Sequence, residues 1–419
     1  MSRARHDRQT VVMVTTSYPR FPGDGIGTFI EPIAHGIAQR GHDVHVVAPW
    51  HPLVRRPPRQ GSVRFHFFRY APLQRLSLFG YAAALKADVG LRPAVYLVTP
   101  LALAAGWRAV RRVVRRTGAS ILHAHWVVPG GFLAAMSNPG LPLVISLHGS
   151  DVFVAERNPV ARSAARFAFG RAQWVTACSD DLRRRALGLG ARDARTEVLP
   201  YGVDVDRFRP NSGTRVRIRR AHGLGDTDQL VVAAGRLVRK KGFEFLIDAV
   251  ATLQAAWPRL TLLLAGGGDL EQELHQRAAR QGVGQRVVFL GAVAQDDVAE
   301  LLAAADVVAV PSVRDDAGNV DGLPNVLLEA LASGTPVVAT AAGGMGAVAI
   351  DGETARVVPE RSPEPLAAAI DELLRRPEYG AQLGRQARSE MRRTRSWARV
   401  AERFEQAYAR AAERSPVSR

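Results

Sequence analysis

A short basic loop in the second half of the chain has the residue types that bind a diphosphate. The loop 235–242 reads Gly-Arg-Leu-Val-Arg-Lys-Lys-Gly and follows a β-branched apolar run at 230–234. Arginine offers a planar fork of N–H donors and lysine a compact positive charge, which together suit two linked phosphates. Only three lysines occur in the chain, and two of them, Lys240 and Lys241, lie in this loop. A solvated basic turn is the alternative, but the position after an apolar run favours the diphosphate.

A stretch that begins at Asp321 combines a helix start, a central carboxylate and a helix stop. Gly322 and Pro324 favour a helix start, and the free amides of a first helical turn attract anionic oxygen. Glu329 falls in the middle of this helix among leucines, where a carboxylate needs hydrogen-bond donors. The two hydroxyls of a ribose would serve, because an ionised carboxylate only accepts. Gly334 is the expected C-cap.

The first half has a glycine-rich loop directly before an expected helix start at Thr28. Gly23, Gly25 and Gly27 would let backbone amides approach a phosphate at the helix N-terminus. The spacing is not Gly-x-Gly-x-x-Gly, so it gives little support to a nicotinamide cofactor. A long flexible loop that binds nothing remains the alternative.

Histidines follow two expected strands of the first half. His148 comes directly after the apolar run 143–147, where a catalytic or sugar-contacting group of a parallel sheet is expected. A histidine that caps a buried turn is the plainer alternative. We expect the side chains of His123 and His125 to point to opposite faces, and a metal site needs further ligands at suitable spacing. We therefore favour a structural or acceptor-side role for these two residues and expect no metal.

Short β-branched runs alternate with amphipathic stretches along the chain, as in parallel sheets covered by helices. We expect two doubly wound, Rossmann-like α/β domains, with ligands bound at the carboxyl ends of the strands. The division falls in the turn-rich segment 201–219, which gives domains 1–203 and 204–395. The expected strands are 11–15, 44–48, 63–68, 120–123, 143–147, 174–178, 230–234, 260–265, 287–290, 307–310 and 336–339, and the expected helices include 243–253, 296–305, 324–332 and 396–415.

Composition narrows the class of protein. Hydrophobic residues make up 47% and charged residues 23% of the 419 residues, so sizeable cores can form. The single cysteine, Cys178, excludes an intrachain disulfide and a cysteine-based zinc site. No apolar run is long enough for a membrane-spanning helix, and the first apolar run is too short for a signal peptide. The expected compartment is the cytoplasm.

The positive charge belongs to one half of the chain. The net charge is +17, and residues 1–200 carry 27 basic and 11 acidic side chains, whereas residues 201–419 carry 29 and 28. A basic half attracts the phosphates of a nucleic acid, a membrane surface or an anionic substrate. No nucleic-acid-binding motif is present, and one half is nearly neutral, so we expect no nucleic acid partner.

These motifs, taken together, resemble glycosyltransferase family 4, which comprises retaining transferases of the GT-B fold. The resemblance covers almost the whole chain and rests on the following segments: the glycine loop at 25–27, His148-Gly-Ser-Asp151, Tyr201-Gly-Val-Asp-Val-Asp-Arg-Phe208, the basic loop 235–242, and Asp321-x7-Glu329. It implies an N-terminal domain for the acceptor and a C-terminal domain for a UDP- or GDP-linked sugar, with the last helix returning to the first domain.

The resemblance also implies site residues. Arg236 and Lys241 would bind the donor diphosphate and stabilise the leaving group, which would make a metal or other cofactor unnecessary. Glu329 would hold the ribose, and His148 would lie beside the transferred sugar. The other implied donor contacts are Gly25, Gly27, Asp321, Leu323, Pro324, Asn325 and Val326. The usual mechanism proposed for such enzymes has no enzymic nucleophile, and the leaving phosphate accepts the proton of the acceptor.

The chain departs from the family pattern at several positions. Asp321 replaces the usual glutamate, and the segment 343–347 lacks the usual proline and glutamate and ends at Ala347. Tyr201 stands where asparagine is usual. The longer segment 314–320 is more similar to transferases of exopolysaccharides and lipid-linked oligosaccharides. A sugar-nucleotide-binding protein with an impaired transferase site, a sugar-nucleotide epimerase and a basic nucleic-acid-binding protein are the alternatives.

A basic amphipathic helix is expected at 107–116. Its apolar positions are 107, 110, 113 and 114, and arginines occupy the rest of its surface. Such a helix suits an anionic membrane surface, with an apolar edge at 76–81 beside it. The alternative is a core-facing helix with a solvated arginine face. We therefore expect a lipid-linked or polysaccharide acceptor, and a peripheral location on the inner face of the cell membrane.

Overall fold

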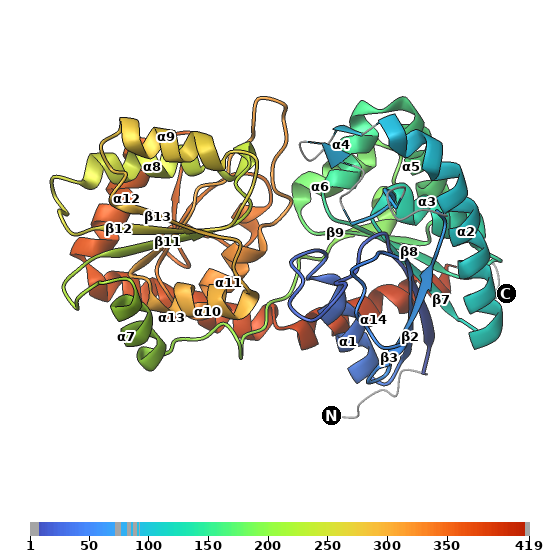
Figure 1. The fold of residues 1–419 in the computed structure, drawn as a ribbon. Helices are drawn as coiled ribbons and strands as arrows, with labels where there is room; N and C mark the ends of the chain where they lie inside the picture. Colours follow the sequence, from blue (N-terminus) through green and yellow to red (C-terminus); the bar gives the residue numbers. More distant parts are fainter. Residues whose placement is uncertain (1–7, 72–76, 82–84, 87–89, 92, 415–419) are drawn as a thin grey trace, which may run out of the picture. The chain divides into compact units, whose positions relative to one another are not determined.

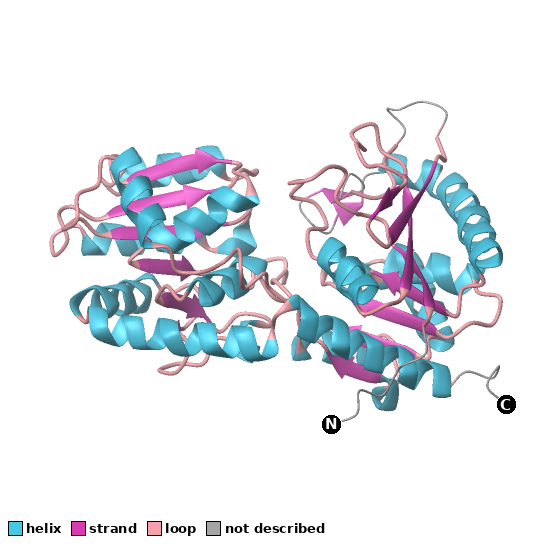
Figure 2. Cartoon of the chain, turned by 90° about the horizontal axis from the view of Figure 1, so that it is seen from below, coloured by secondary structure: helices cyan, strands magenta, loops and turns pink. Residues whose placement is uncertain are grey.

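The computed structural model describes residues 8–71, 77–81, 85–86, 90–91 and 93–414. The chain forms two compact units, which we call the first unit (Met1–Pro200 with Trp397–Arg419) and the second unit (Tyr201–Ser396). Each unit is a largely parallel sheet covered by helices on both faces, which confirms the expected fold class (Figures 1 and 2). The domain boundaries expected from the sequence were 203/204 and 395/396.

The first unit is built on a sheet with the strand order β10-β9-β8-β7-β1-β2-β4-β3. Neighbouring strands run parallel, apart from β3, which is antiparallel to β4. The bounds are β1 Thr10–Val14, β2 Asp43–Pro49, β3 Arg59–Gln60, β4 Val63–Phe68, β7 Ile121–His125, β8 Leu143–Leu147, β9 Trp174–Ala177 and β10 Thr196–Val198, with a separate antiparallel pair of β5 Leu85–Lys86 and β6 Gly90–Leu91.

Helices cover both faces of this sheet. On one face lie α1 (Ile30–Gln39) and α14 (Trp397–Glu413), and on the other α2 (Pro93–Thr117), α3 (Phe132–Ser137) and α5 (Pro159–Arg171). The remaining helices of the unit are α4 (Ser150–Arg157) and α6 (Asp180–Gly188). None of the described helices is both long enough and apolar enough to cross a membrane.

The C-terminal helix α14 is part of the core of the first unit. Its buried side chains recur three or four residues apart and pack with β1, β2 and α1: Val400, Ala401, Phe404, Ala407, Tyr408 and Ala411. Its one buried carboxylate, Glu405, accepts hydrogen bonds from Arg40 and from His42, whose Nε2 lies 2.9 Å away. The return of the last helix to the first domain is thereby confirmed.

The second unit has a parallel sheet with the order β13-β12-β11-β14-β15-β16. The helices α8, α9 and α12 cover one face, and α7, α10, α11 and α13 cover the other (Figure 1). The bounds are β11 Leu230–Ala234, β12 Thr261–Ala265, β13 Val287–Gly291, β14 Val307–Val310, β15 Val337–Thr340, β16 Arg356–Val358, α7 Ser212–Ala221, α8 Phe243–Leu253, α9 Glu271–Arg280, α10 Gln295–Ala304, α11 Asn325–Ser333, α12 Pro363–Arg375 and α13 Pro377–Thr394.

Three differences from the sequence analysis have physical causes. The edge strands β10 and β16 were missed because they are short and interrupted by charged residues. The second part of the expected turn-rich segment 201–219 is helix α7, whose polar arginines hid its helical period. The expected apolar surface at 76–81 is wrong for Phe79 and Tyr81, which are buried; Leu76 lies outside the described residues.

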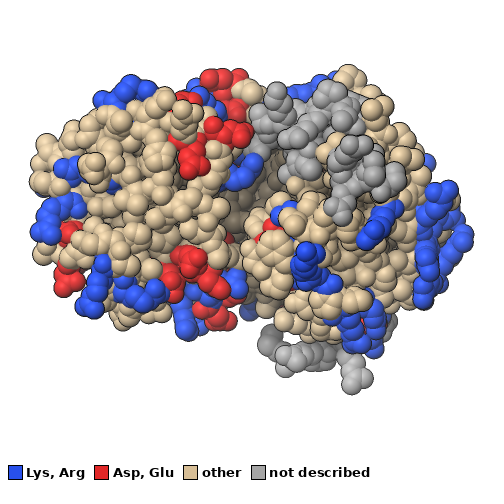
Figure 3. Space-filling model, viewed as in Figure 1, with Lys and Arg blue, Asp and Glu red and all other residues tan. Residues whose placement is uncertain are grey.

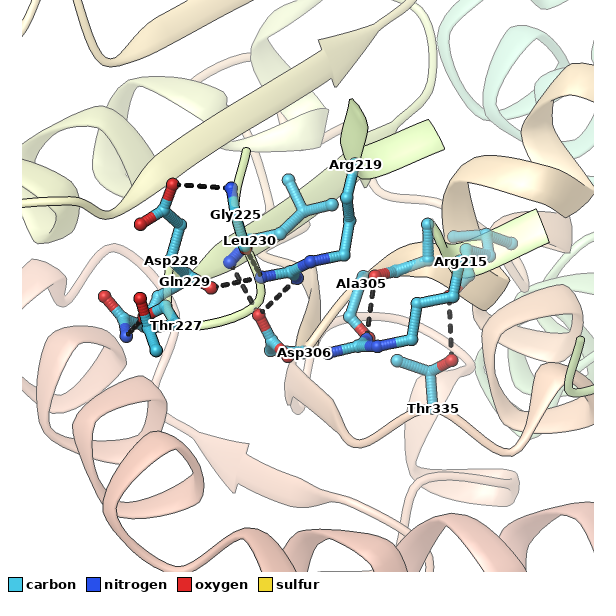
Figure 4. A network of polar contacts seen from close by, with 12 residues as sticks. Arg215, Arg219, Gly225, Thr227, Asp228, Gln229, Leu230, Ala305, Asp306 and Thr335 are labelled. Atoms are coloured by element: carbon cyan, nitrogen blue, oxygen red, sulfur yellow. Dashed lines mark hydrogen bonds and ion pairs between the residues drawn. The ribbon is translucent and has the colours of Figure 1, made fainter. Parts of the chain in front are cut away.

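Figure 4 shows the network by which α7 is attached to the sheet of the second unit. The guanidinium of Arg219, a buried side chain, donates to Asp306 at 3.1 Å and to the carbonyl of Gly225 at 2.9 Å. Asp306 also accepts the backbone N–H of Leu230 at 2.7 Å, and Arg215 donates to the same carboxylate. The network therefore joins α7 to the starts of β11 and β14.

We expect Asp306→Ala to lower the free energy of unfolding of the second unit by about 3 kcal/mol, because it leaves Arg219 buried without its carboxylate. Urea unfolding of the full chain measures the loss. The matched control is Arg217→Ala on the same helix, whose side chain is 57% exposed and pairs with Glu300; its loss should stay below about 1 kcal/mol. Equal losses in the two variants would contradict a structural role for the network.

Candidate active site

Close backbone approach brings together the loops that follow β11, β14 and β15. Gly242 has φ +65°, and a Cβ there would lie 2.1 Å from the carbonyl oxygen of Pro311. Gly343 has φ +58°, and a Cβ there would lie 2.0 Å from the carbonyl oxygen of Asp321. Any larger residue at these two positions would push the loops apart. The carboxyl edge of the sheet is therefore where the loop residues expected to bind phosphate meet.

Two lysines and one carboxylate form the charged centre of this edge. Asp321 Oδ2 lies 2.7 Å from Lys241 Nζ, and Asp321 Oδ1 lies 3.2 Å from Lys240 Nζ. Ser312 Oγ is 3.3 Å from Asp321 Oδ2. Burial alone would raise the pKa of Asp321, but the two ammonium groups outweigh it and hold the pKa well below its usual range. The carboxylate is thus ionised, and it compensates both lysines.

Glu329 lies on α11 and interacts electrostatically with Lys241. Gln295 Nε2 donates to Glu329 Oε1 at 3.2 Å, and Gln295 accepts in turn from Arg207 at 2.6 Å. Burial raises the pKa of Glu329 to about 7, although Gln295, Arg207 and Lys241 act in the opposite direction. A carboxyl group with this pKa needs donors to remain ionised. The sequence analysis did not identify Gln295, since only the fold brings it to Glu329.

The remaining expected donor contacts of the second unit lie on the same loops. Arg236 follows β11 with an exposed side chain. Pro324 occupies the N-cap of α11, where a proline side chain cannot cap the first turn. Leu323 and Val326 are buried and Asn325 is half-buried, so this stretch offers backbone groups more than side chains. The αL C-cap at Gly334 was predicted correctly.

In the first unit, an ion pair gives the glycine loop a defined shape. Arg20 Nε donates to Asp24 Oδ2 at 2.7 Å, and Arg20 Nη2 donates to Asp24 Oδ1 at 2.8 Å. The backbone N–H of Arg20 also donates to Asp24 Oδ2 at 2.8 Å, so the carboxylate ties the two ends of the turn together. Gly25 and Gly27 follow Asp24 directly and lead into α1.

The histidines at the end of β7 and directly after β8 form one group, in which His123 and His125 are buried and His148 is half-buried. His125 Nδ1 lies 3.0 Å from His148 Nε2, and His123 Nδ1 lies 2.8 Å from the hydroxyl of Tyr408. The rings of His123 and His125 are 4.2 Å apart, so the expectation of opposite faces was wrong: residues i and i+2 of a strand share a face. Burial lowers the pKa of all three histidines, which are neutral. Among the described residues, no three side chains of His, Cys, Asp or Glu are placed to hold a metal ion.

Comparisons with known proteins place the chain among glycosyltransferases. The family model described as "Glycosyltransferase Family 4" matches residues 23–207, and "Glycosyl transferases group 1" matches residues 214–390. Solved structures with the same fold include HepE from Anabaena in complex with UDP (TM-score 0.76, 21% identity, 96% of this chain and 99% of that chain). A sucrose-phosphate synthase from Thermosynechococcus elongatus is also similar (TM-score 0.78, 20% identity, 97% and 100%).

Curated relatives give higher sequence identity. A "GDP-mannose-dependent alpha-(1-6)-phosphatidylinositol monomannoside mannosyltransferase" of Mycolicibacterium smegmatis is 38% identical over 58% of this chain and 63% of its own length. This chain covers 60% of the length of the counterpart from Mycobacterium tuberculosis. The chain therefore spans less than two thirds of the length of these two relatives. A "GDP-mannose-dependent monoacylated alpha-(1-6)-phosphatidylinositol monomannoside mannosyltransferase" of Corynebacterium glutamicum is 33% identical over 62% of this chain and 68% of that protein.

Two parallel-sheet units with this strand order and these neighbours define the GT-B class of glycosyltransferase folds. The chain belongs to glycosyltransferase family 4.

The raised pKa of Glu329 makes the stability of the second unit depend on pH. The carboxyl ionises near 4.5 in the unfolded chain and at about 7 in the folded chain. The folded state therefore binds a proton at Glu329 more tightly than the unfolded state does. The contribution of Glu329 to the free energy of unfolding is fully present below pH 4.5 and is lost as the pH rises through about 7. The variant Glu329→Gln cannot ionise, so its thermal midpoint should rise relative to wild type from about pH 5 to about pH 8. A difference that stays constant over this range would show that Glu329 has an ordinary pKa.

Proposed function

We propose that the chain is a retaining, metal-independent hexosyltransferase that moves a hexose from a UDP- or GDP-linked sugar to a hydroxyl acceptor. The observation that carries this proposal is the pair Lys240 and Lys241, compensated by Asp321 and followed by Glu329 at one edge of the sheet. Ligands of open α/β sheets bind at the carboxyl ends of the strands. Relatives named for GDP-mannose and a fold neighbour in complex with UDP support a nucleotide sugar of either base.

We assign each site residue a role in donor binding or in sugar transfer. Arg236 and Lys241 bind the donor diphosphate and stabilise the negative charge that develops as the bond to the sugar breaks. Glu329 accepts hydrogen bonds from the ribose hydroxyls, and the amides of the first turn of α11 donate to the phosphates. The bond from the sugar to the acceptor oxygen forms on the same side, and the acceptor proton passes to the leaving phosphate. No side chain of the chain becomes covalently attached.

The acceptor that we propose is a lipid-linked or polysaccharide precursor at the inner membrane surface. The apolar positions expected to meet the membrane were wrong for Val110, Val113 and Val114, which are buried, so that part of α2 faces the core. The support from α2 comes instead from Leu97 and Leu101, which are 80% and 56% exposed. Four exposed arginines continue this surface toward the C-terminus of α2: Arg108, Arg112, Arg115 and Arg116. Figure 3 shows basic side chains at the edge of the first unit where Figure 1 places α2. Among the described residues, no acidic side chain pairs with these arginines. Apolar and basic groups side by side suit an anionic bilayer.

The donor is tested by thermal shift with UDP-glucose, UDP-galactose, UDP-GlcNAc, GDP-mannose, UDP and GDP. A ligand that binds only the folded chain raises the melting temperature, and at about 100 times its Kd it adds about 2.7 kcal/mol. We expect one nucleotide class to act on wild type and to fail with Arg236→Ala and Glu329→Ala. The matched control is Arg239→Ala, since Arg239 lies in the same loop but pairs with Glu273. No shift with any compound would favour an impaired site or a nucleic acid partner.

The membrane surface is tested by flotation with vesicles that contain phosphatidylglycerol, at about 0.15 M salt. Wild type should float, and Arg112→Glu/Arg115→Glu/Arg116→Glu should lose at least about tenfold in binding, because each basic side chain near an anionic surface contributes about 1 kcal/mol. The control has the same change of net charge on α13: Arg385→Glu/Arg392→Glu/Arg393→Glu. If wild type does not float, or if both variants lose equal amounts of binding, α2 is not the membrane-binding surface.

A further inference from the structure

Within the second unit, one glutamine side chain joins Arg207 of the motif 201–208 to the carboxylate of Glu329. We propose that Gln295 is a positioning residue that holds the Glu329 carboxylate ionised and oriented for the ribose of the donor, and that Arg207 fixes the direction of the Gln295 amide. Gln295 acts on the donor through Glu329. The inference rests on the proposed function, because it deepens the part that Glu329 plays there.

The direction of the Gln295 amide follows from its two partners. Arg207 Nη1 lies 2.6 Å from Gln295 Oε1, and Gln295 Nε2 lies 3.2 Å from Glu329 Oε1. A guanidinium only donates, so the amide atom that faces Arg207 must be the oxygen. The NH2 group then faces Glu329 and donates to it. A reversed amide would place its NH2 group against the guanidinium, so Arg207 keeps the donor turned toward the carboxylate.

The turn that carries Arg207 is itself fixed at several points. Asp204 Oδ1 accepts the backbone N–H of Arg207 at 3.0 Å. The next residue, Phe208, is buried, and its carbonyl accepts a hydrogen bond from Arg388 of α13 at 2.8 Å. Arg207 Nε also lies 3.1 Å from a carboxylate oxygen of Asp296. The guanidinium is therefore held at the start of α10, where it meets the Gln295 amide.

The contact with Gln295 leaves room on the carboxylate for a ligand. Glu329 is half-buried on α11, which packs beside α10 on one face of the sheet (Figure 1). Gln295 donates to Oε1, and in the part of the chain that the structure describes Oε2 has no hydrogen-bond donor. An ionised carboxylate accepts at about four lone-pair positions, so both hydroxyls of a ribose find an acceptor.

The same hydrogen bond acts on the charge of Glu329. Burial raises the pKa of Glu329 to about 7, and the effects that lower the pKa are, largest first, the hydrogen bond from Gln295 and the charges of Arg207 and Lys241. Loss of Gln295 therefore raises the pKa further, because a donor to the ionised form disappears. The hydroxyls of a ribose also donate, so they favour the ionised form.

Charged side chains on the helices next to α11 have partners of their own. On α10, Asp296 pairs with Arg207 and Glu300 pairs with Arg217 of α7. On α13, Arg388 donates to the carbonyl groups of Phe208 and Val205. The hydrogen bond from Gln295 is thus the contact through which a substitution changes the carboxylate most directly.

The test compares nucleotides that have and lack the two ribose hydroxyls. Calorimetry of the full chain at about pH 8 gives Kd for UDP and GDP and for their 2′,3′-dideoxy forms. The base that binds should bind wild type about tenfold more tightly as the ribose form, and Gln295→Met should reduce this preference to about twofold. The dideoxy form should bind both proteins equally.

A pH profile separates this role from a merely structural one. In wild type the preference for the ribose form should grow from about pH 6 to about pH 8, and in Gln295→Met the growth should move up by about one pH unit. The phosphates of the two nucleotides titrate alike, so the ratio of the two Kd values removes their contribution. A role confined to packing would weaken both nucleotides equally and leave the profile in place.

Two variants of Arg207 test the direction of the amide. Arg207→Leu frees the amide to turn around, so the preference for the ribose form should fall about threefold. Arg207→Lys keeps a donor to the Gln295 oxygen and should restore most of the preference.

The matched control is Gln281→Met, which removes another glutamine of the second unit, whose Nε2 donates to Asp248 at 2.9 Å. It should change neither Kd. A full preference in Gln295→Met, or the same loss in Gln281→Met, would overturn the proposal.

Failure of the proposed function gives a different result. In that case wild type binds neither UDP nor GDP, or Glu329→Ala keeps the preference for the ribose form. The contact is then measured without nucleotide, through the rise of the thermal midpoint that Glu329→Gln causes. This rise should continue to a higher pH in the Gln295→Met background than in wild type, and an unchanged range would overturn the proposal.

Discussion

The carboxylate of Asp321 allows two ammonium groups to remain charged side by side in a largely buried place. Two lysines in one loop repel each other, and removal of water raises the free energy of each charge. The carboxylate offsets both effects, at 2.7 Å and 3.2 Å from the two Nζ atoms. The neighbouring loops are arranged around this interaction, because the approach of Gly343 to Asp321 and of Gly242 to Pro311 brings the three side chains together.

The two units differ in the groups that follow their central strands. The second unit, nearly neutral overall, gathers charges at its edge, whereas the strongly basic first unit keeps neutral histidines and a carboxylate surrounded by amide donors there. Exposed arginines of the first unit include Arg108, Arg112, Arg115 and Arg116 of α2. The net charge of a domain and the charge of its site are therefore separate properties. The net charge influences which charged surfaces attract the protein.

Local patterns predicted the elements, and longer-range contacts decided the site. Strands β8, β11 and β14 were predicted to the residue because uninterrupted β-branched runs flanked by turn residues leave little choice. The helical period of α7 was concealed by its arginines, because the buried face includes the polar side chain of Arg219. The pairing of Lys240 with Asp321 depends on backbone approaches that no spacing encodes, and the donor contacts carried over from the family stay predictions. The error at His123 and His125 came from a wrong periodicity.

The position of α14 also constrains the order in which the chain can fold during synthesis. The sheet of the first unit leaves the ribosome first, yet its core is incomplete until Phe404 and Tyr408 have been translated. The second unit has all of its strands and helices by residue 394 and ends at Ser396, before α14 begins. The unit that begins the chain is therefore the last to mature, and a ribosome that stalls near the end would leave the face of β1 and β2 without its cover.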